Sequence, residues 1–125
     1  MVTVFLLVAE NDNLAFTLTE HTSLRYLADY MQKDFSTMCQ FMPILMELLR
    51  AVDGQLHSFL CKAGLECFFA TSWLITWFAH DVKSLDSIAR IFDVLLSSHP
   101  MHCYYLCVAV RTSMYVCMSD GWYVF

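Results

Sequence analysis

The sequence SWLITWFAHDV, residues 72 to 82, is so apolar that its place in the folded protein decides the fold. On a helical wheel, its large side chains and those just before it surround the axis, and only Ser72 and Thr76 share a narrow polar stripe. A helix of this kind must be buried on most sides. It either spans a membrane or lies at the centre of a helical domain.

The length of the segment argues against a membrane span. The uncharged run from Cys67 to His80 covers about 21 Å as an α-helix, whereas the hydrocarbon core of a bilayer is roughly 30 Å thick. The longest uncharged run, from Val94 to Val110, is broken by the polar sequence SSHP and is followed by Arg111. The start, MVTVFLLVAENDN, lacks the basic region and cleavage site of a signal peptide. We therefore expect residues 66–80 to form a central core helix packed by its neighbours.

The composition indicates one domain with little polar surface. The chain has 125 residues, of which 58% are apolar and 15% charged, so water-exposed apolar surface is expected unless a partner covers it. The net charge of -5, with no run of Lys or Arg, argues against a phosphate-backbone footprint. Nucleic acid is therefore not an expected partner.

Six cysteines raise the question of disulfides. They lie in apolar, helix-like stretches and no secretory signal precedes them, which favours reduced core thiols in a cytoplasmic protein. A small secreted disulfide-bonded bundle is the alternative, and a count of free thiols under denaturant distinguishes the two. The cysteines are Cys39, Cys61, Cys67, Cys103, Cys107 and Cys117.

Apolar residues recur at helical spacing along most of the chain, which has only three glycines and two prolines, so the predicted fold class is all-α. The clearest amphipathic pattern lies in residues 85–97, where Asp86 precedes Arg90 by four residues, the favourable order for a helical ion pair. We expect helices at residues 2–9, 13–21, 23–32, 36–52, 55–62, 66–80, 85–97 and 101–117.

Two groups of side chains deserve a test for chemistry. His99, Cys103 and Cys107 recur every four residues and could present three zinc ligands on one helical face. Pro100 interrupts that register and no close Cys-x-x-Cys pair supplies a fourth ligand, so buried thiols explain the row better. His80 and Asp81 are helix neighbours and do not face each other.

No known catalytic signature supplies a site either. The chain has no Gly-x-Ser-x-Gly elbow, Walker loop or His-Glu-x-x-His run. We therefore assign no catalytic, cofactor-binding or metal-ligating residue and expect no cofactor.

Residues 68 to 100, FFATSWLITWFAHDVKSLDSIARIFDVLLSSHP, resemble a segment of TBC domains, the all-helical Rab GTPase-activating proteins. The Trp-bearing helix, the short connection and the Arg90-Ile-Phe-Asp93 helix with its leucines carry the similarity. The WLITWF run, the FMPIL segment at 41–45 and the start TVFLLV most resemble the branch with a C-terminal membrane anchor, which acts on Rabs of the early secretory pathway. The resemblance implies a Rab partner and a role in vesicle transport. It places the parent protein at endoplasmic reticulum or Golgi membranes.

The resemblance also implies which groups do the chemistry. TBC domains supply an arginine from an Ile-x-x-Asp-x-x-Arg motif and a glutamine from a Tyr-x-Gln-Gly motif, and both motifs precede the segment that matches this chain. The runs from Ile44 to Arg50 and from Tyr30 to Gln32 look like these motifs but occur in the wrong order, with Glu47 in place of Asp and Lys33 in place of Gly. We interpret Glu47 and Arg50 as an ordinary helix-surface pair.

The expected organisation is therefore a partial TBC domain at residues 1–110 and a divergent tail at 111–125, with neither the finger motifs nor the anchor. Such a chain, a fragment or truncated isoform, is predicted to be inactive alone, and its link to a membrane would depend on the parent's anchor. The alternative is a non-catalytic helical interaction module or a membrane-peripheral bundle.

Overall fold

The computed structural model describes residues 1–9, 11–33, 36–65 and 67–119, and the regular elements within these ranges are all helical. The predicted all-α class is confirmed. Seven α-helices and two 3₁₀ segments follow one another as α1 (Val2–Val8), α2 (Asp12–Arg25), η1 (Ala28–Met31), α3 (Ser36–Val52), α4 (Gly54–Lys62), η2 (Cys67–Ala70), α5 (Thr71–Thr76), α6 (Leu85–Ser97) and α7 (His102–Ser119).

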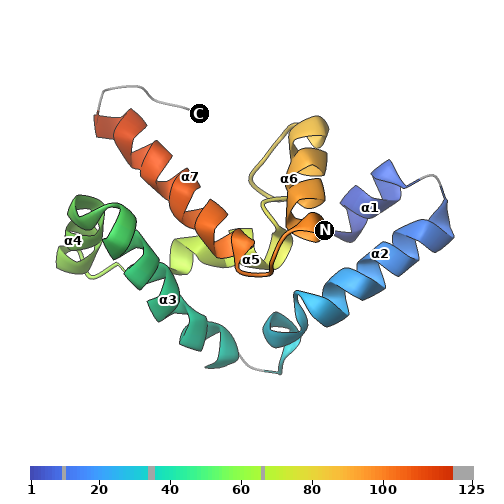
Figure 1. The fold of residues 1–125 in the computed structure, drawn as a ribbon, viewed down its shortest axis with the longest axis horizontal. Helices are drawn as coiled ribbons and strands as arrows, with labels where there is room; N and C mark the ends of the chain where they lie inside the picture. Colours follow the sequence, from blue (N-terminus) through green and yellow to red (C-terminus); the bar gives the residue numbers. More distant parts are fainter. Residues whose placement is uncertain (10, 34–35, 66, 120–125) are drawn as a thin grey trace.

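The helices form an open arch (Figure 1). Helices α1 and α2 pack together as one arm, and α3 and α4 form the other. The short α5 crosses the region between the arms and contacts α7, while α6 packs on α1 and α3 packs on α7 and η2. The arrangement places the Trp-bearing segment between the two arms.

Side-chain caps explain where several helices begin. The Asn11 side chain accepts a hydrogen bond from the Leu14 N–H at 2.9 Å, and Asp53 accepts one from the Leu56 N–H at 2.9 Å. The Ser84 hydroxyl caps α6 in the same way. Each cap pairs a backbone donor that has no partner within its own helix.

The Trp-bearing segment differs from its prediction in one respect. The expected helix over residues 66–80 is instead η2 followed by α5, which ends at Thr76. Trp77 and Phe78 adopt left-handed backbone conformations, with φ of 51° and 65°, and such conformations cost about 1–2 kcal/mol for each non-glycine residue. Burial offsets this cost, because each of the two aromatic side chains is only 2% exposed.

The expectation of a central core segment is confirmed for part of its residues. Leu74 is buried with Trp77 and Phe78, and the Trp77 ring meets the rings of Tyr26 and Phe92 edge to face, each at 5.3 Å. These contacts tie α5 to the end of α2 and to α6. The expectation is wrong for Phe68, which is 55% exposed.

Two other details differ from the sequence expectations. The helices expected at 13–21 and 23–32 are one continuous α2 followed by the single turn η1. Among the described residues the ion pair that forms is Glu47 with Arg50, and Asp86 is not paired with Arg90. In the same part of the chain, no single helix is long and apolar enough to cross a membrane. The helical segments Gly54–Lys62 and Cys67–Thr76 together have the required length and composition, but they are bent by 113° relative to each other.

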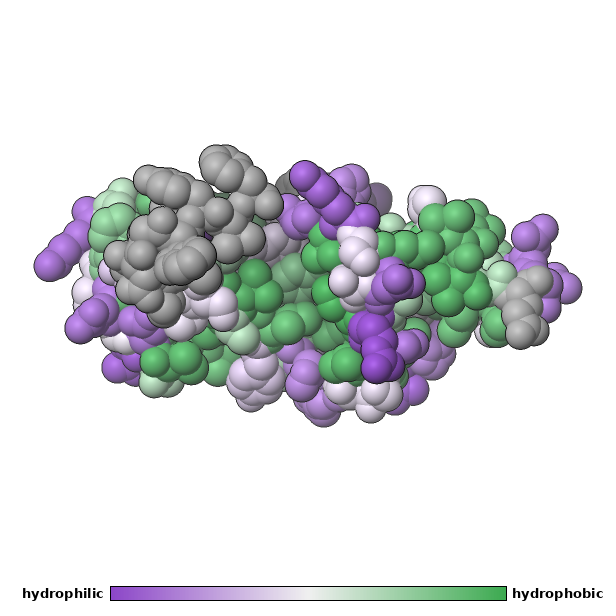
Figure 2. Space-filling view, turned by 90° about the horizontal axis from the view of Figure 1, so that it is seen from above, coloured by the Kyte–Doolittle hydropathy of each residue, from purple (hydrophilic) through white to green (hydrophobic). Residues whose placement is uncertain are grey.

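Helices α1 and α2 leave a broad apolar face uncovered. In the space-filling view, hydrophobic side chains gather at the end of the molecule that these two helices form (Figure 2). The surface that composition predicted is therefore present, and we call it the α1–α2 face. The exposed large apolar residues of the two helices, which point to more than one side of them, are Val2, Leu6, Leu7, Val8, Leu14, Phe16 and Leu24.

Candidate functional site

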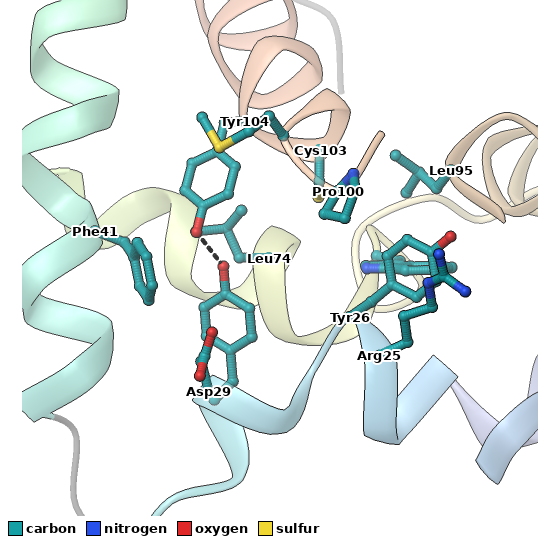
Figure 3. A pocket seen from close by; sticks show the side chains of 12 residues that line it. Arg25, Tyr26, Asp29, Phe41, Leu74, Leu95, Pro100, Cys103 and Tyr104 are labelled. Atoms are coloured by element: carbon teal, nitrogen blue, oxygen red, sulfur yellow. Dashed lines mark hydrogen bonds between the residues drawn. The ribbon is translucent and has the colours of Figure 1, made fainter. Parts of the chain in front are cut away.

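A cavity of about 150 Å³ lies where the end of α2, η1, α5 and the start of α7 meet (Figure 3). Aromatic rings form much of its wall, and the charged groups come from the end of α2 and from η1. The lining residues are Arg25, Tyr26, Asp29, Tyr30, Phe41, Leu74, Trp77, Leu95, Pro100, Met101, Cys103 and Tyr104.

The central polar contact of the cavity is a hydrogen bond between the hydroxyls of Tyr30 and Tyr104. Burial raises the pKa of the Tyr104 phenol. Burial, and then the hydrogen bond to Tyr104, raise the pKa of the Tyr30 phenol far above its usual value. Both hydroxyls are therefore neutral at physiological pH, and the pair joins η1 to α7 rather than supplying a nucleophile.

The charged residues of the cavity do not assemble a catalytic group. Arg25 and Asp29 are exposed and form no ion pair with each other within the described structure. No group of three His, Cys, Asp or Glu side chains in the described ranges is arranged to hold a metal ion. The Tyr30–Tyr104 hydrogen bond at the cavity connects η1 with α7, and no metal cluster or ion pair is found among the described residues that line it.

The residues that resemble finger motifs lie in ordinary structural roles. Arg50 binds Glu47 at 2.6 Å on the surface of α3, with both side chains 64% exposed, which confirms the interpretation as a helix-surface pair. Tyr30 bonds to Tyr104, and the Gln32 amide donates to the Ala28 carbonyl at 3.1 Å. The structure therefore does not bring Arg50 and Gln32 together in one site.

The proposed zinc row is divided between surface and core. His99 is exposed and its Nδ1 accepts from the Met101 N–H at 3.2 Å, whereas Cys103 and Cys107 are buried. A hydrogen bond to Cys103, and then burial, raise the pKa of the Cys107 thiol. A thiol held in its neutral form is a poor metal ligand.

The remaining candidates also have structural explanations. Asp81 accepts a hydrogen bond from the Ser72 hydroxyl at 3.1 Å, in the turn after α5, and His80 is exposed beside it. Among the described cysteines, Cys67, Cys103 and Cys107 are buried, while Cys39 and Cys61 are exposed. The expectation of core thiols is therefore wrong for the last two, and the Cys117 side chain lies outside those described.

Sequence reasoning did not identify the Tyr30–Tyr104 pair. The two residues are 74 positions apart, and neither belongs to a motif that would signal the contact. Only the packing of η1 against the start of α7 brings them together.

Comparison with known proteins places these features in a wider context. Residues 1–115 match the Rab-GTPase-TBC domain. The chain is 37% identical over 111 residues to "GTPase-activating protein gyp10" of Schizosaccharomyces pombe, covering 86% of this chain and 30% of that protein. It is 35% identical over 101 residues to "TBC1 domain family member 20" of Homo sapiens, covering 81% and 25%. The chain thus spans between a quarter and a third of the length of these relatives.

Proposed function

We propose, from the premise that this chain belongs to the Rab-GTPase-TBC domain family, that it supplies a helical part of a Rab GTPase-activating domain and does not accelerate GTP hydrolysis by itself. The assignment to a Rab GTPase-activating domain rests on the family match over residues 1–115. The predicted lack of activity rests on the catalytic side chains that the sequence does not contain.

The chemistry of GTP hydrolysis explains why particular side chains decide activity. The transition state needs charge stabilisation and a positioned water, and an arginine supplied in trans can raise the rate by about 10³–10⁵. Neither motif that supplies the arginine and glutamine in this family occurs in the sequence. Arg50, the nearest substitute, is held by Glu47 on the same helix. A Rab bound to this chain would therefore receive neither group.

Two observations support a role as part of a larger domain. The chain covers 30% of gyp10 and 25% of the human relative. The α1–α2 face leaves apolar side chains in water, which is the kind of surface that another part of a domain would cover. We assign residues 1–110 to the partial domain and 111–125 to a divergent tail, of which residues 111–115 still lie within the family match.

The proposed parent belongs to the branch with a C-terminal membrane anchor and acts on a Rab of the early secretory pathway, at endoplasmic reticulum or Golgi membranes. Supporting this is the resemblance of the WLITWF run to that branch. The chain itself would be cytoplasmic, and its connection to a membrane would depend on the parent's anchor.

A second candidate function is a non-catalytic helical interaction module, which the same exposed apolar face favours. The two differ in one measurable respect. A domain part should become more soluble when co-expressed with the remainder of gyp10, whereas an independent module should be a stable monomer or should bind liposomes alone.

Single-turnover GTP hydrolysis by candidate Rabs, with and without the purified chain, tests the proposal. The expected result is an unchanged rate with the chain and with its Arg50→Ala variant. A rate raised by about a hundredfold, within the range of a GTPase-activating protein, would overturn the proposal. Loss of such a rate in Arg50→Ala would identify Arg50 as the finger.

A further inference from the structure

A second hollow, which we call the Arg111 groove, lies between α7, η2 and the end of α4 with the described residues that follow it. It has a volume of about 400 Å³, within the range of roughly 300–1,000 Å³ that is usual for small-molecule sites. A ligand could reach two of the lining side chains from solvent, since Leu65 is 52% exposed and Phe68 is 55% exposed. The described lining residues are Leu60, Gly64, Leu65, Phe68, Phe69 and Arg111.

Arg111 is the charged side chain among these lining residues. Its guanidinium carbon lies 4.8 Å from the centre of the Phe69 ring, so the ring supports the cation from one side. No hydrogen bond or ion pair joins Arg111 to another residue that the structure describes. The guanidinium therefore has donors available to a ligand, and its Nε–H is buried without an acceptor.

One nitrogen of the Arg111 guanidinium is buried without a partner. Among the described residues, the buried side-chain polar atoms without a partner are Thr71 Oγ1, Arg111 Nε and Thr112 Oγ1. Thr71 begins α5, and Arg111 and Thr112 lie on α7, which packs against α5. Buried polar atoms are nearly always paired in folded proteins; the two threonines do not line the groove, but the unpaired Arg111 Nε belongs to a lining residue and indicates that an acceptor belongs there.

We propose that the Arg111 groove binds an anionic amphiphile with a single alkyl chain. Its carboxylate or phosphate would accept hydrogen bonds from the Arg111 guanidinium, and its chain would lie along Leu60, Leu65 and Phe68. An unpaired cation in an apolar groove selects this combination, because a neutral chain leaves the cation unpaired and a small anion leaves the apolar walls in water. The inference does not depend on the proposed function in GTP hydrolysis.

Dodecyl phosphate below its micelle concentration is a suitable probe, titrated into the full chain by isothermal calorimetry. We expect saturable binding of one molecule. Each methylene that becomes buried should strengthen binding by up to about fourfold, so octyl phosphate should bind at least about tenfold more weakly. Dodecyltrimethylammonium, with the same chain and the opposite charge, should bind more weakly still, and inorganic phosphate should not bind measurably.

Two substitutions test the site itself. Arg111→Gln should weaken binding of dodecyl phosphate by about tenfold or more, whereas Arg90→Gln, at an exposed arginine on α6, should have no effect. Because Arg111 packs on Phe69, circular dichroism must show that the variant keeps its helices. Phe68→Glu offers an independent test at an exposed position, since an added carboxylate should repel the probe; the matched control is Phe16→Glu.

Several results would overturn the proposal. Equal binding of the cationic and anionic probes would show that charge is not recognised, and equal binding of inorganic phosphate would reduce the groove to a simple anion site. Unchanged binding in Phe68→Glu would place the probe elsewhere. Loss of binding in Phe16→Glu alone would place it on the α1–α2 face. If Arg111→Gln unfolds, Phe68→Glu is the remaining test of the site: weaker binding of dodecyl phosphate supports the proposal and unchanged binding overturns it.

Discussion

Replacing Tyr104 by Phe tests whether the hydrogen bond between η1 and α7 stabilises the fold. Tyr104 is 6% exposed, and its hydroxyl bonds to that of the half-buried Tyr30. Removing one partner leaves the other polar group unpaired, which costs about 1–3 kcal/mol when it is buried. Because water can reach part of Tyr30, we expect Tyr104→Phe to lower the free energy of unfolding by about 1–2 kcal/mol.

The double variant Tyr30→Phe with Tyr104→Phe separates this effect from lost packing. Removing both hydroxyls leaves no unpaired group, so the double variant should be nearly as stable as the original chain. Each single variant should therefore be less stable than the double variant. Tyr105→Phe, at a 55% exposed position on the same helix, is the matched control and should change stability by less than about 0.5 kcal/mol.

The assay is urea unfolding followed by circular dichroism at neutral pH, with the four proteins of the cycle measured side by side. Losses in the single variants that simply add in the double variant would refute the reasoning, because independent residues are additive whereas partners are not. A loss in Tyr105→Phe as large as in Tyr104→Phe would also refute it.

The pH dependence of unfolding provides a second readout of the same pair. Burial raises the pKa of both phenols above the value of about 10 that Tyr has in an unfolded chain. The unfolded state therefore loses its protons first as the pH rises. The contribution to stability is complete below about pH 10 and is lost above it. The double Phe variant should lose less stability than the original chain across that range, while Cys107, whose pKa is also raised, affects both proteins alike.

Three further changes have expected outcomes of different size. Trp77→Ala removes a buried ring with two edge-to-face partners and should cost about 3–5 kcal/mol in urea unfolding; Trp77→Gly should be no less stable than Trp77→Ala, because the backbone is left-handed there. Asp53→Ala removes the cap of α4 and should cost about 1 kcal/mol, with loss of helicity but no change in compactness by gel filtration. A thiol reagent should label the exposed Cys39 and Cys61 in the native chain, as measured by mass spectrometry. The buried Cys67, Cys103 and Cys107 should be labelled only under denaturant.

Much of the fold follows from sequence periodicity, and α6 shows why. Its apolar residues lie on one helical face, Ser84 caps its start, and the helix spans Leu85–Ser97 as expected. The Trp-bearing segment contains no Gly or Pro near its break, so periodicity predicts one continuous helix. The chain leaves the helix at Trp77 because turning there buries the Trp77 ring against Tyr26 and Phe92, and it also stacks the buried Phe78 ring on Trp73. That gain depends on tertiary contacts, which a local pattern does not contain.

The sequence predicts less about the candidate site than about the fold, because it shows local relations between residues but not contacts between distant ones. The roles of Glu47 and Arg50 follow from their i, i+3 spacing, a local relation that sequence expresses directly. The contact of Tyr30 with Tyr104 and the stacking of Arg111 on Phe69 join distant parts of the chain. No residue type at these positions distinguishes them from the other tyrosines and arginines. Sequence could therefore reject a site but could not locate one.

The charges of the two apolar hollows make the amphiphile experiment discriminating. The groove between α1, α2 and α6, of about 180 Å³, contains Val8, Leu14 and Phe92, and the charged residue among its described lining is Asp93. A carboxylate there disfavours an anionic headgroup and tolerates a cationic one, whereas Arg111 does the reverse. Alkyl chains alone would not distinguish the two hollows. A preference for dodecyl phosphate over dodecyltrimethylammonium therefore reports on the Arg111 groove, and the opposite preference would indicate binding beside Asp93.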